Sequence, residues 1–245
     1  MGILANRFHG LMQDLNQMVM REYRLELANK SNQLMALQAQ INPHFLNNAL
    51  QSIGTLALQH EAPKIYALIN SLAKMMHYSM NTNESVVPLR KEIDHIKAYL
   101  ELQKQRFEHQ FEIVYAIEEE TQVFTVPKMT LQPLVENYFK HGFKPSHSQD
   151  VGILRIESEK LVTPEGDFLK LTVEDNGIGI SDQRISEVRT LLKAASVTDD
   201  SSIGLRNVLT RVQLYFNDDA TLAIDHVHPH GLRIVILIPM KKGVT

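Results

Sequence analysis

A change of hydrophobic period near residue 110 constrains the fold of this 245-residue chain more than any other feature. Before it, apolar residues recur every three or four positions, as they do across 65–76. This spacing predicts amphipathic helices over 61–80 and 88–108. After it, residues 111–117 alternate apolar with polar side chains, which predicts a β-strand. The chain therefore has a helical N-terminal part and a C-terminal part that contains a sheet.

The N-terminal part has the pattern of helices that pair. Residues 1–56 are predicted to be helical, and across 20–41 apolar side chains follow a three-four rhythm typical of coiled coils. A helix with such an exposed seam is poorly stable alone, so we expect it to pair with a second copy in a four-helix bundle. We place a linker helix at 1–30, a helical dimerisation region at 31–87 and a second domain at 88–245.

The second domain mixes strands with helices. Helices are predicted over 130–142, 181–192 and 204–216, and strands over 111–117, 153–162, 168–174, 220–227 and 232–239. Ser181 is a preferred N-cap residue. Because several neighbouring strands are joined by hairpins, we expect an α+β fold with a mostly antiparallel or mixed sheet and helices on one face.

Composition excludes several functional classes. The chain has no cysteine, which excludes disulfides and thiolate metal sites. Its net charge of −3 gives no electrostatic argument for nucleic-acid binding. No apolar run approaches the ~20 residues that span a bilayer. His226, His228 and His230 alternate near the C-terminus. A metal site and a solvated cluster both remain open for them.

Residues 131–143, LQPLVENYFKHGF, have the pattern of an amphipathic helix with two distinct faces. One face is apolar and holds Leu131, Leu134, Val135 and Phe139, and the other is polar and holds Glu136, Asn137, Lys140 and His141. Magnesium bound to a nucleotide prefers oxygen ligands, and phosphates prefer positive charge, which Asn137 and Lys140 offer. An ordinary surface helix is the alternative interpretation.

Two glycine-containing motifs follow. In VEDNGIGI, Asp175 ends a predicted strand, and Gly177 and Gly179 come directly after it. Glycine allows a ligand to approach the backbone closely, and a carboxylate accepts hydrogen bonds from a group such as the amino group of adenine. In SSIGLRNV, a polar loop runs through Gly204 into a helix with Arg206 near its start, where free N–H groups favour phosphate. Neither motif is a P-loop or a Rossmann fingerprint.

A further motif lies upstream, in QINPHFLNNAL at 40–50. Pro43 interrupts a helical pattern, so we expect a kink that turns His44 outward. Asn48 follows one helical turn later and can hydrogen-bond the imidazole ring of His44. A bundle histidine at a kinked helix is the alternative interpretation.

In their order along the chain, VENYFKHG, EDNGIGI and SIGLRNV resemble the N box and the two glycine boxes of the GHKL ATPase domain, which histidine kinases share with gyrase. QINPHFLNNAL resembles the phosphoacceptor motif of the LytS/YesM-type sensor histidine kinases, and residues 11–20 resemble the end of a HAMP linker. The resemblance covers nearly the whole chain, and the ordered motifs together are highly specific. It implies a phosphoacceptor region within 31–87 and a Bergerat-type ATP-binding sandwich in 88–245.

The resemblance also implies roles for single residues. His44 would be the phosphorylated imidazole, with Asn48 beside it. Asn137 would hold Mg²⁺, with Lys140 and His141 near the phosphates of ATP.

The glycine boxes would complete the nucleotide site. Asp175 would bind the adenine amino group in a pocket shaped by Gly177 and Gly179. The mobile lid would be 193–202, followed by the phosphate-side residues Gly204, Leu205, Arg206 and Asn207. The second glycine box departs from the family pattern, because Ser202 stands where its first glycine is usual.

The sequence therefore predicts the cytoplasmic part of a sensor histidine kinase. It would use ATP and Mg²⁺ to phosphorylate itself at His44 and would pass the group to an aspartate of a response-regulator receiver domain. It would act as a homodimer, with a membrane anchor upstream and no nucleic-acid partner. The alternatives are a nucleotide-binding interaction module with weak or no transfer and a GHKL-type ATPase.

Overall fold

The computed structural model describes residues 43–81, 84–108, 110–144, 151–164, 166–193, 203–216 and 219–240. The chain divides into two compact units between Ser52 and Ile53. In the first unit the structure describes residues 43–52, which form the beginning of helix α2. The whole helix is Pro43–Gln59. The predicted linker helix at 1–30 and the seam across 20–41 lie outside them, and the domain limits remain predictions.

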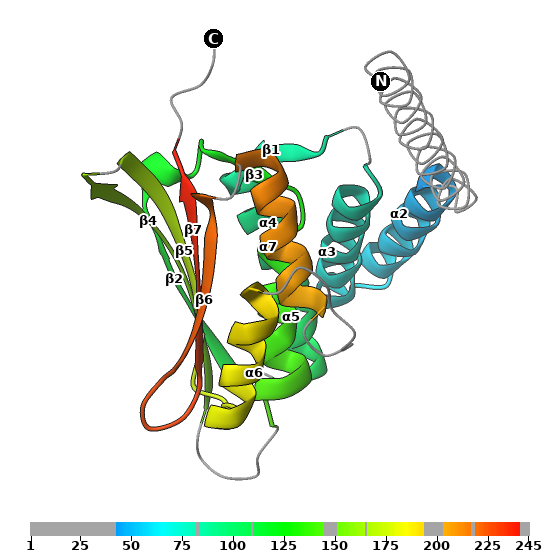
Figure 1. Cartoon of the computed structure of the whole chain (residues 1–245). Coiled ribbons are helices and arrows are strands. Elements are labelled where there is room, and N and C mark those ends of the chain that lie inside the picture. The colour runs from blue at the N-terminus through cyan, green and yellow to red at the C-terminus, as the bar shows by residue number, and fades with distance from the viewer. Residues whose placement is uncertain are drawn as a thin grey trace, which may run out of the picture. The chain divides into compact units, whose positions relative to one another are not determined.

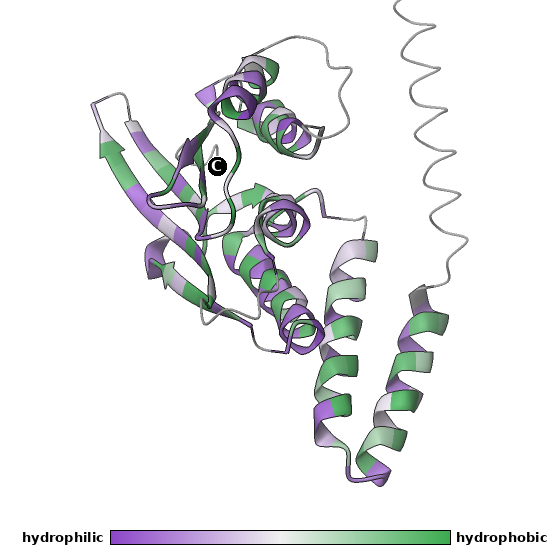
Figure 2. Cartoon of the chain, turned by 90° about the horizontal axis from the view of Figure 1, so that it is seen from below, coloured by the Kyte–Doolittle hydropathy of each residue, from purple (hydrophilic) through white to green (hydrophobic). Residues whose placement is uncertain are grey.

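The second unit begins with the end of α2 and continues into α3, Pro63–Met80. Gly54 lies where a Cβ atom would be 3.3 Å from the ring of Tyr66, so the absence of a side chain lets the two helices approach. Apolar residues recur along both helices (Figure 2), and Ile53, Leu56 and Ile65 stay about half exposed. This exposure is what the predicted pairing of helices requires.

Helix α4, Leu89–Arg106, follows the short strand β1, Val86–Pro88. Its buried apolar face repeats every three or four residues and contains Leu89, Ile93, Ile96 and Leu100, as predicted. Strand β1 pairs antiparallel with a second short strand, β3, Thr125–Pro127. The sequence did not predict this pair.

A five-stranded sheet forms one layer of the second unit (Figure 1). Its spatial order is β2 (Phe111–Ile117), β4 (Gly152–Thr163), β5 (Gly166–Asp175), β7 (Leu232–Pro239) and β6 (Thr221–His226). Strands β2 and β4 are parallel, and the other neighbours are antiparallel. The predicted mixed sheet is confirmed.

The helices cover one face of this sheet (Figure 1). They are α4, α5 (Gln132–Asn137) with its continuation η2 (Tyr138–Gly142), α6 (Asp182–Lys193) and α7 (Ile203–Phe216), and a short 3₁₀ turn, η1 (Glu119–Thr121), follows β2. Alternate strand residues, such as Leu154, Leu171 and Ile236, are buried in the core of the unit. The α+β fold expected from the sequence is confirmed.

The other face of the sheet carries a row of charged side chains. Arg155, Glu174, Arg233 and Asp225 are cross-strand neighbours on β4, β5, β7 and β6, and their charges alternate. The Nε atom of Arg233 lies 2.6 Å from a carboxylate oxygen of Glu174. Such opposite-charge pairs suit a solvated sheet face, which explains why helices cover only the apolar side. None of the described helices is both long and apolar enough to cross a bilayer.

Candidate functional site

A cavity of about 150 Å³ lies between the sheet and the helices α5, η2, α6 and α7. Its walls are mainly apolar and include Leu134, Val173, Ile180, Val188, Leu205 and Ile234. Its polar groups come from Asn137, Tyr138, His141, Asp175 and Arg184. An apolar cavity with a few convergent polar groups is the usual form of a small-ligand site.

Asp175 is the buried carboxylate of this cavity. It follows Leu171 and Val173 in the two-residue period of β5, so its side chain falls on the helix-covered face of the sheet. Only 8% of the residue is exposed, and its Oδ1 atom accepts a hydrogen bond from the Gly177 N–H at 2.8 Å. Burial raises the pKa of Asp175 to about 6, although backbone hydrogen bonds from Gly177 and Leu232 oppose the shift. At neutral pH the group is therefore an ionised acceptor.

The two glycines after Asp175 allow the backbone to fold tightly against it. A Cβ atom on Gly177 would lie 2.5 Å from the carbonyl oxygen of Gly142, to which Ile178 donates a hydrogen bond. Gly179 has a φ of 66°, which glycine adopts without strain, and it lines the cavity. Gly177 lies beside the cavity and holds the end of η2 against this loop.

The predicted helix at 130–142 changes its geometry half-way. Helix α5 ends at Asn137, and η2 continues it as a π-helix, with the Phe143 N–H bonded to the Tyr138 carbonyl oxygen at 2.6 Å. Such π-turns are rare in proteins as a whole, but those that occur are often found at functional sites. Asn137 and His141 line the cavity. Lys140 does not, because its ammonium group pairs with Glu136 at 2.8 Å and its side chain is 62% exposed.

The start of α7 brings only one of its predicted residues into the cavity. Leu205 lines it, whereas Asn207 is exposed and a Cβ atom on Gly204 would meet no atom within 4 Å. The Nη1 atom of Arg206 donates to the Leu191 carbonyl oxygen at 2.8 Å, and Arg206 lines a different cavity. The lid residues after 193, including Ser202, lie outside the described residues.

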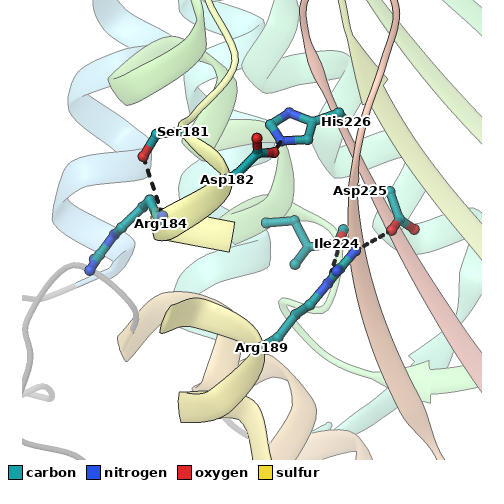
Figure 3. Close-up of polar contacts among 7 residues, drawn as sticks. All are labelled: Ser181, Asp182, Arg184, Arg189, Ile224, Asp225 and His226. Carbon is teal, nitrogen blue, oxygen red and sulfur yellow. Dashed lines mark hydrogen bonds and ion pairs between the residues drawn. The ribbon is translucent and has the colours of Figure 1, made fainter. Parts of the chain in front are cut away.

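Helix α6 forms one wall of the cavity and is tied to the edge strand β6 (Figure 3). Ser181 caps the helix, as predicted, by accepting the Arg184 N–H at 3.3 Å. Arg189 donates to the Ile224 carbonyl oxygen at 2.9 Å and pairs with Asp225 at 2.5 Å. These contacts fix the wall that contains Arg184 and Val188.

The three C-terminal histidines do not converge. His226 pairs with Asp182 at 2.7 Å, and the Nδ1 atom of His230 donates to the carbonyl oxygens of Asn176 and Gly177 at 2.8 and 3.0 Å. No group of three histidine, aspartate or glutamate residues in the described part of the chain could hold a metal ion. His226 instead ties β6 to the start of α6, and His230 holds the loop that follows Asp175.

His44 is exposed in the first turn of α2. The Nδ2 atom of Asn48 lies 3.3 Å from its Nδ1 atom, so the hydrogen bond expected between these side chains is present. With the amide in this orientation, Nδ1 accepts and the proton of the neutral ring lies on Nε2. The kink predicted at Pro43 involves preceding residues that are not among those described.

Comparison with known proteins assigns the family. Residues 32–111 match the family model described as histidine kinase. The chain is 34% identical over 244 residues to the sensor histidine kinase YesM of Bacillus subtilis (strain 168). This match covers 100% of the chain and 40% of that protein. It is 30% identical over 241 residues to the sensor protein kinase HptS of Staphylococcus aureus (strain USA300). This match covers 98% of the chain and 44% of that protein.

The chain belongs to the sensor histidine kinases. It spans less than half the length of these two relatives. Among solved structures, it is similar to the histidine kinase domain of a blue-light-activated histidine kinase from Erythrobacter litoralis. The TM-score is 0.45 at 15% identity, over 86% of the chain and 94% of that domain.

Sequence reasoning missed two polar residues of this cavity. The hydroxyl of Tyr138 is buried and has no hydrogen-bond partner among the described residues, and burial, with the charge of Asp175, raises its pKa. The sequence did not single out Tyr138, because an aromatic residue next to an apolar helix face indicates a position in the hydrophobic core. Arg184 lies in a helix that matched no motif, and only its place in the first turn after Ser181 hinted at a position near the glycine loop.

Proposed function

We propose that this chain binds ATP with Mg²⁺ in the cavity at Asp175, phosphorylates itself at His44, and passes the phosphoryl group to an aspartate of a response-regulator receiver domain. The observation that carries the proposal is the buried Asp175 carboxylate in a cavity whose walls are mainly apolar. A carboxylate there accepts a hydrogen bond from the amino group of adenine, and the apolar walls pack against the ring.

Residues of α5 and η2 suit the phosphates. The amide oxygen of Asn137 is a hard ligand, and Mg²⁺ commonly takes one or two protein oxygens together with phosphates and water. His141 lines the same cavity and would lie near the phosphate oxygens. Lys140 would reach them only after it leaves Glu136. Mg²⁺ would supply charge neutralisation at the β- and γ-phosphates.

The acceptor is His44. Its neutral imidazole attacks the γ-phosphorus atom, an N–P bond forms, the bond from the γ-phosphorus atom to the bridging oxygen breaks, and ADP leaves. Because Asn48 faces Nδ1, we assign the attack to Nε2. A half-turn of the Asn48 amide lets its oxygen accept the Nδ1 proton, which frees the Nε2 lone pair. Asn48 is therefore proposed to set the tautomer of the ring.

The partners follow from the same chemistry. A phosphorylated imidazole is a donor to a receiver-domain aspartate. The half-exposed apolar residues of α2 and α3 support pairing with a second copy through the helical region. Because the chain spans less than half of its relatives, we propose that it is the cytoplasmic portion of a longer, membrane-anchored sensor.

A second candidate function is nucleotide binding without transfer. The observation in its favour is Arg206, whose guanidinium group bonds Leu191 and does not line the cavity. A phosphate site that lacks this cation would stabilise the transition state less well.

Incubation with γ-labelled ATP separates these functions. The proposal predicts label on the protein. Free labelled phosphate without labelled protein would indicate an ATPase. Bound nucleotide with neither product would indicate a binding module.

A further inference from the structure

The turn that precedes α5 has a strained backbone held from several sides. Met129 has a φ of 64°, in a region that non-glycine residues rarely adopt. Arg211 of α7 donates to the carbonyl oxygens of Lys128 and Met129 at 2.8 and 3.3 Å, and the Thr130 hydroxyl donates to that of Pro127 at 2.6 Å. Strain of this kind persists only where neighbouring groups impose it, and it is frequent in switch regions.

The main restraint on this turn is Glu92 of α4. Glu92 is fully buried. Its two carboxylate oxygens accept hydrogen bonds from the backbone N–H groups of Met129 at 2.7 Å and Leu131 at 2.9 Å. A buried carboxylate is costly unless donors satisfy it, so these bonds fix the turn and the carboxylate to each other.

A third donor to Glu92 comes from α3. The hydroxyl of Tyr78 donates to the same oxygen that accepts the Met129 N–H. Burial, and then the charge of Glu92, raise the pKa of Tyr78, so the phenol keeps its proton and remains a donor. Lys128 strengthens the attachment, because its ammonium group lies 4.8 Å from the centre of the Tyr78 ring and donates to the carbonyl oxygen of Asn81.

A second chain of contacts runs beside the first. The Tyr78 ring stacks on His95 with 4.4 Å between ring centres. The Nε2 atom of His95 lies 2.5 Å from the Gln132 side-chain oxygen, and the Gln132 amide donates to Glu136 at 2.7 Å. Glu136 directly precedes Asn137. Both chains therefore begin at Tyr78; the first ends at Leu131, directly before α5, and the second ends within α5.

We propose that Tyr78 is a positioning residue that transmits the placement of α3 to helix α5, and through α5 to Asn137 in the cavity. When α3 withdraws, Glu92 loses a donor, the strained turn is held less firmly, and the start of α5 loosens. The effect on nucleotide binding rests on the proposed function, whereas the effect on α5 does not. Through this contact the helical region would regulate the site.

Tyr78→Phe tests the proposal in the whole chain, because phenylalanine keeps the ring that stacks on His95 and removes only the hydroxyl. Tyr66→Phe makes the same change on the same helix, at a position in contact with Gly54 and not with Glu92. Amide hydrogen exchange is measured without nucleotide. We expect amides of residues 129–137 to exchange about tenfold faster in Tyr78→Phe and those of α6 to stay unchanged. Tyr66→Phe should change neither.

Two results would overturn the proposal at this stage. One is an amide exchange rate at 129–137 in Tyr78→Phe that equals the rate in the wild type. The other is an equal acceleration in α6, which would show a general loss of stability and not a local loosening.

ATP titration then tests the link to the cavity. Tyr78→Phe should weaken ATP binding about three- to tenfold, and Tyr66→Phe should not. Faster exchange at 129–137 with unchanged ATP affinity would overturn the link. A wild-type chain that does not bind ATP would refute the proposed function, and hydrogen exchange alone would then decide the role of Tyr78.

Discussion

The carboxylate of Asp175 accepts the N–H of Gly177 at 2.8 Å, two residues further along the chain. This contact closes the turn after β5, and the same residue lines the cavity. One side chain therefore both folds the glycine loop and is proposed to recognise adenine.

Asp175→Asn should weaken ATP binding by about 1–3 kcal/mol, because the amide presents a donor where an acceptor is needed. Calorimetric titration measures the affinity. Asp167→Asn is the matched control, since Asp167 lies on the same strand but pairs with Lys160 at the surface. Equal affinities for Asp175→Asn and the wild type would contradict the adenine assignment.

The same carboxylate makes the stability of the protein depend on pH. Burial raises the pKa of Asp175 from 3.8 to about 6, so the folded state favours the protonated form. The free energy of unfolding that the protonated Asp175 carboxyl contributes is fully present below pH 4 and is lost as the pH rises through about 6. Urea unfolding at pH 5 and pH 8 should therefore show Asp175→Asn gaining stability over the wild type as the pH rises. A difference that does not change with pH, or that changes equally for Asp167→Asn, would refute this.

Gly177→Ala should damage the site, because the added Cβ atom would lie 2.5 Å from the Gly142 carbonyl oxygen. Forced packing of this kind costs about 1–3 kcal/mol. Thermal unfolding should show a lower midpoint, with weaker ATP binding. Gly204→Ala is the control, since its Cβ atom would meet nothing within 4 Å, and it should not lower the midpoint. Equal midpoints for the two variants would show that η2 does not press on this loop.

Asn137→Ala should abolish magnesium-dependent labelling and leave the fold intact, because Asn137 lines the cavity and lies outside the buried core. Lys140→Ala removes a neighbouring side chain that points to Glu136 instead, so its effect should be much smaller. Labelling is measured across a range of magnesium concentrations. An unchanged magnesium requirement in Asn137→Ala would mean that another residue holds the ion.

The long elements of the fold were predictable because each buries one face. The three-four spacing in α4 and the two-residue spacing in β2 and β5 follow directly from burial on one side. Strands β1 and β3 have three residues each, which is too short for a period to show.

The site was predictable only where local sequence decides it. Asp175 ends a buried strand face, so its place in the cavity followed from the period of β5. The π-helix did not, because helical spacing assumes 3.6 residues per turn throughout. The bond between Glu92 and Met129 joins residues far apart in the sequence, and no local pattern indicates it.

Labelling from γ-labelled ATP in His44→Gln tests the central claim most directly. Glutamine keeps a polar side chain but removes the imidazole nucleophile, while His60→Gln makes the same change at an exposed histidine after the end of α2. We expect label in the wild type and in His60→Gln that is lost in acid and kept in alkali, and no label in His44→Gln, which should still bind ATP. Acid-labile label on His44→Gln would contradict it.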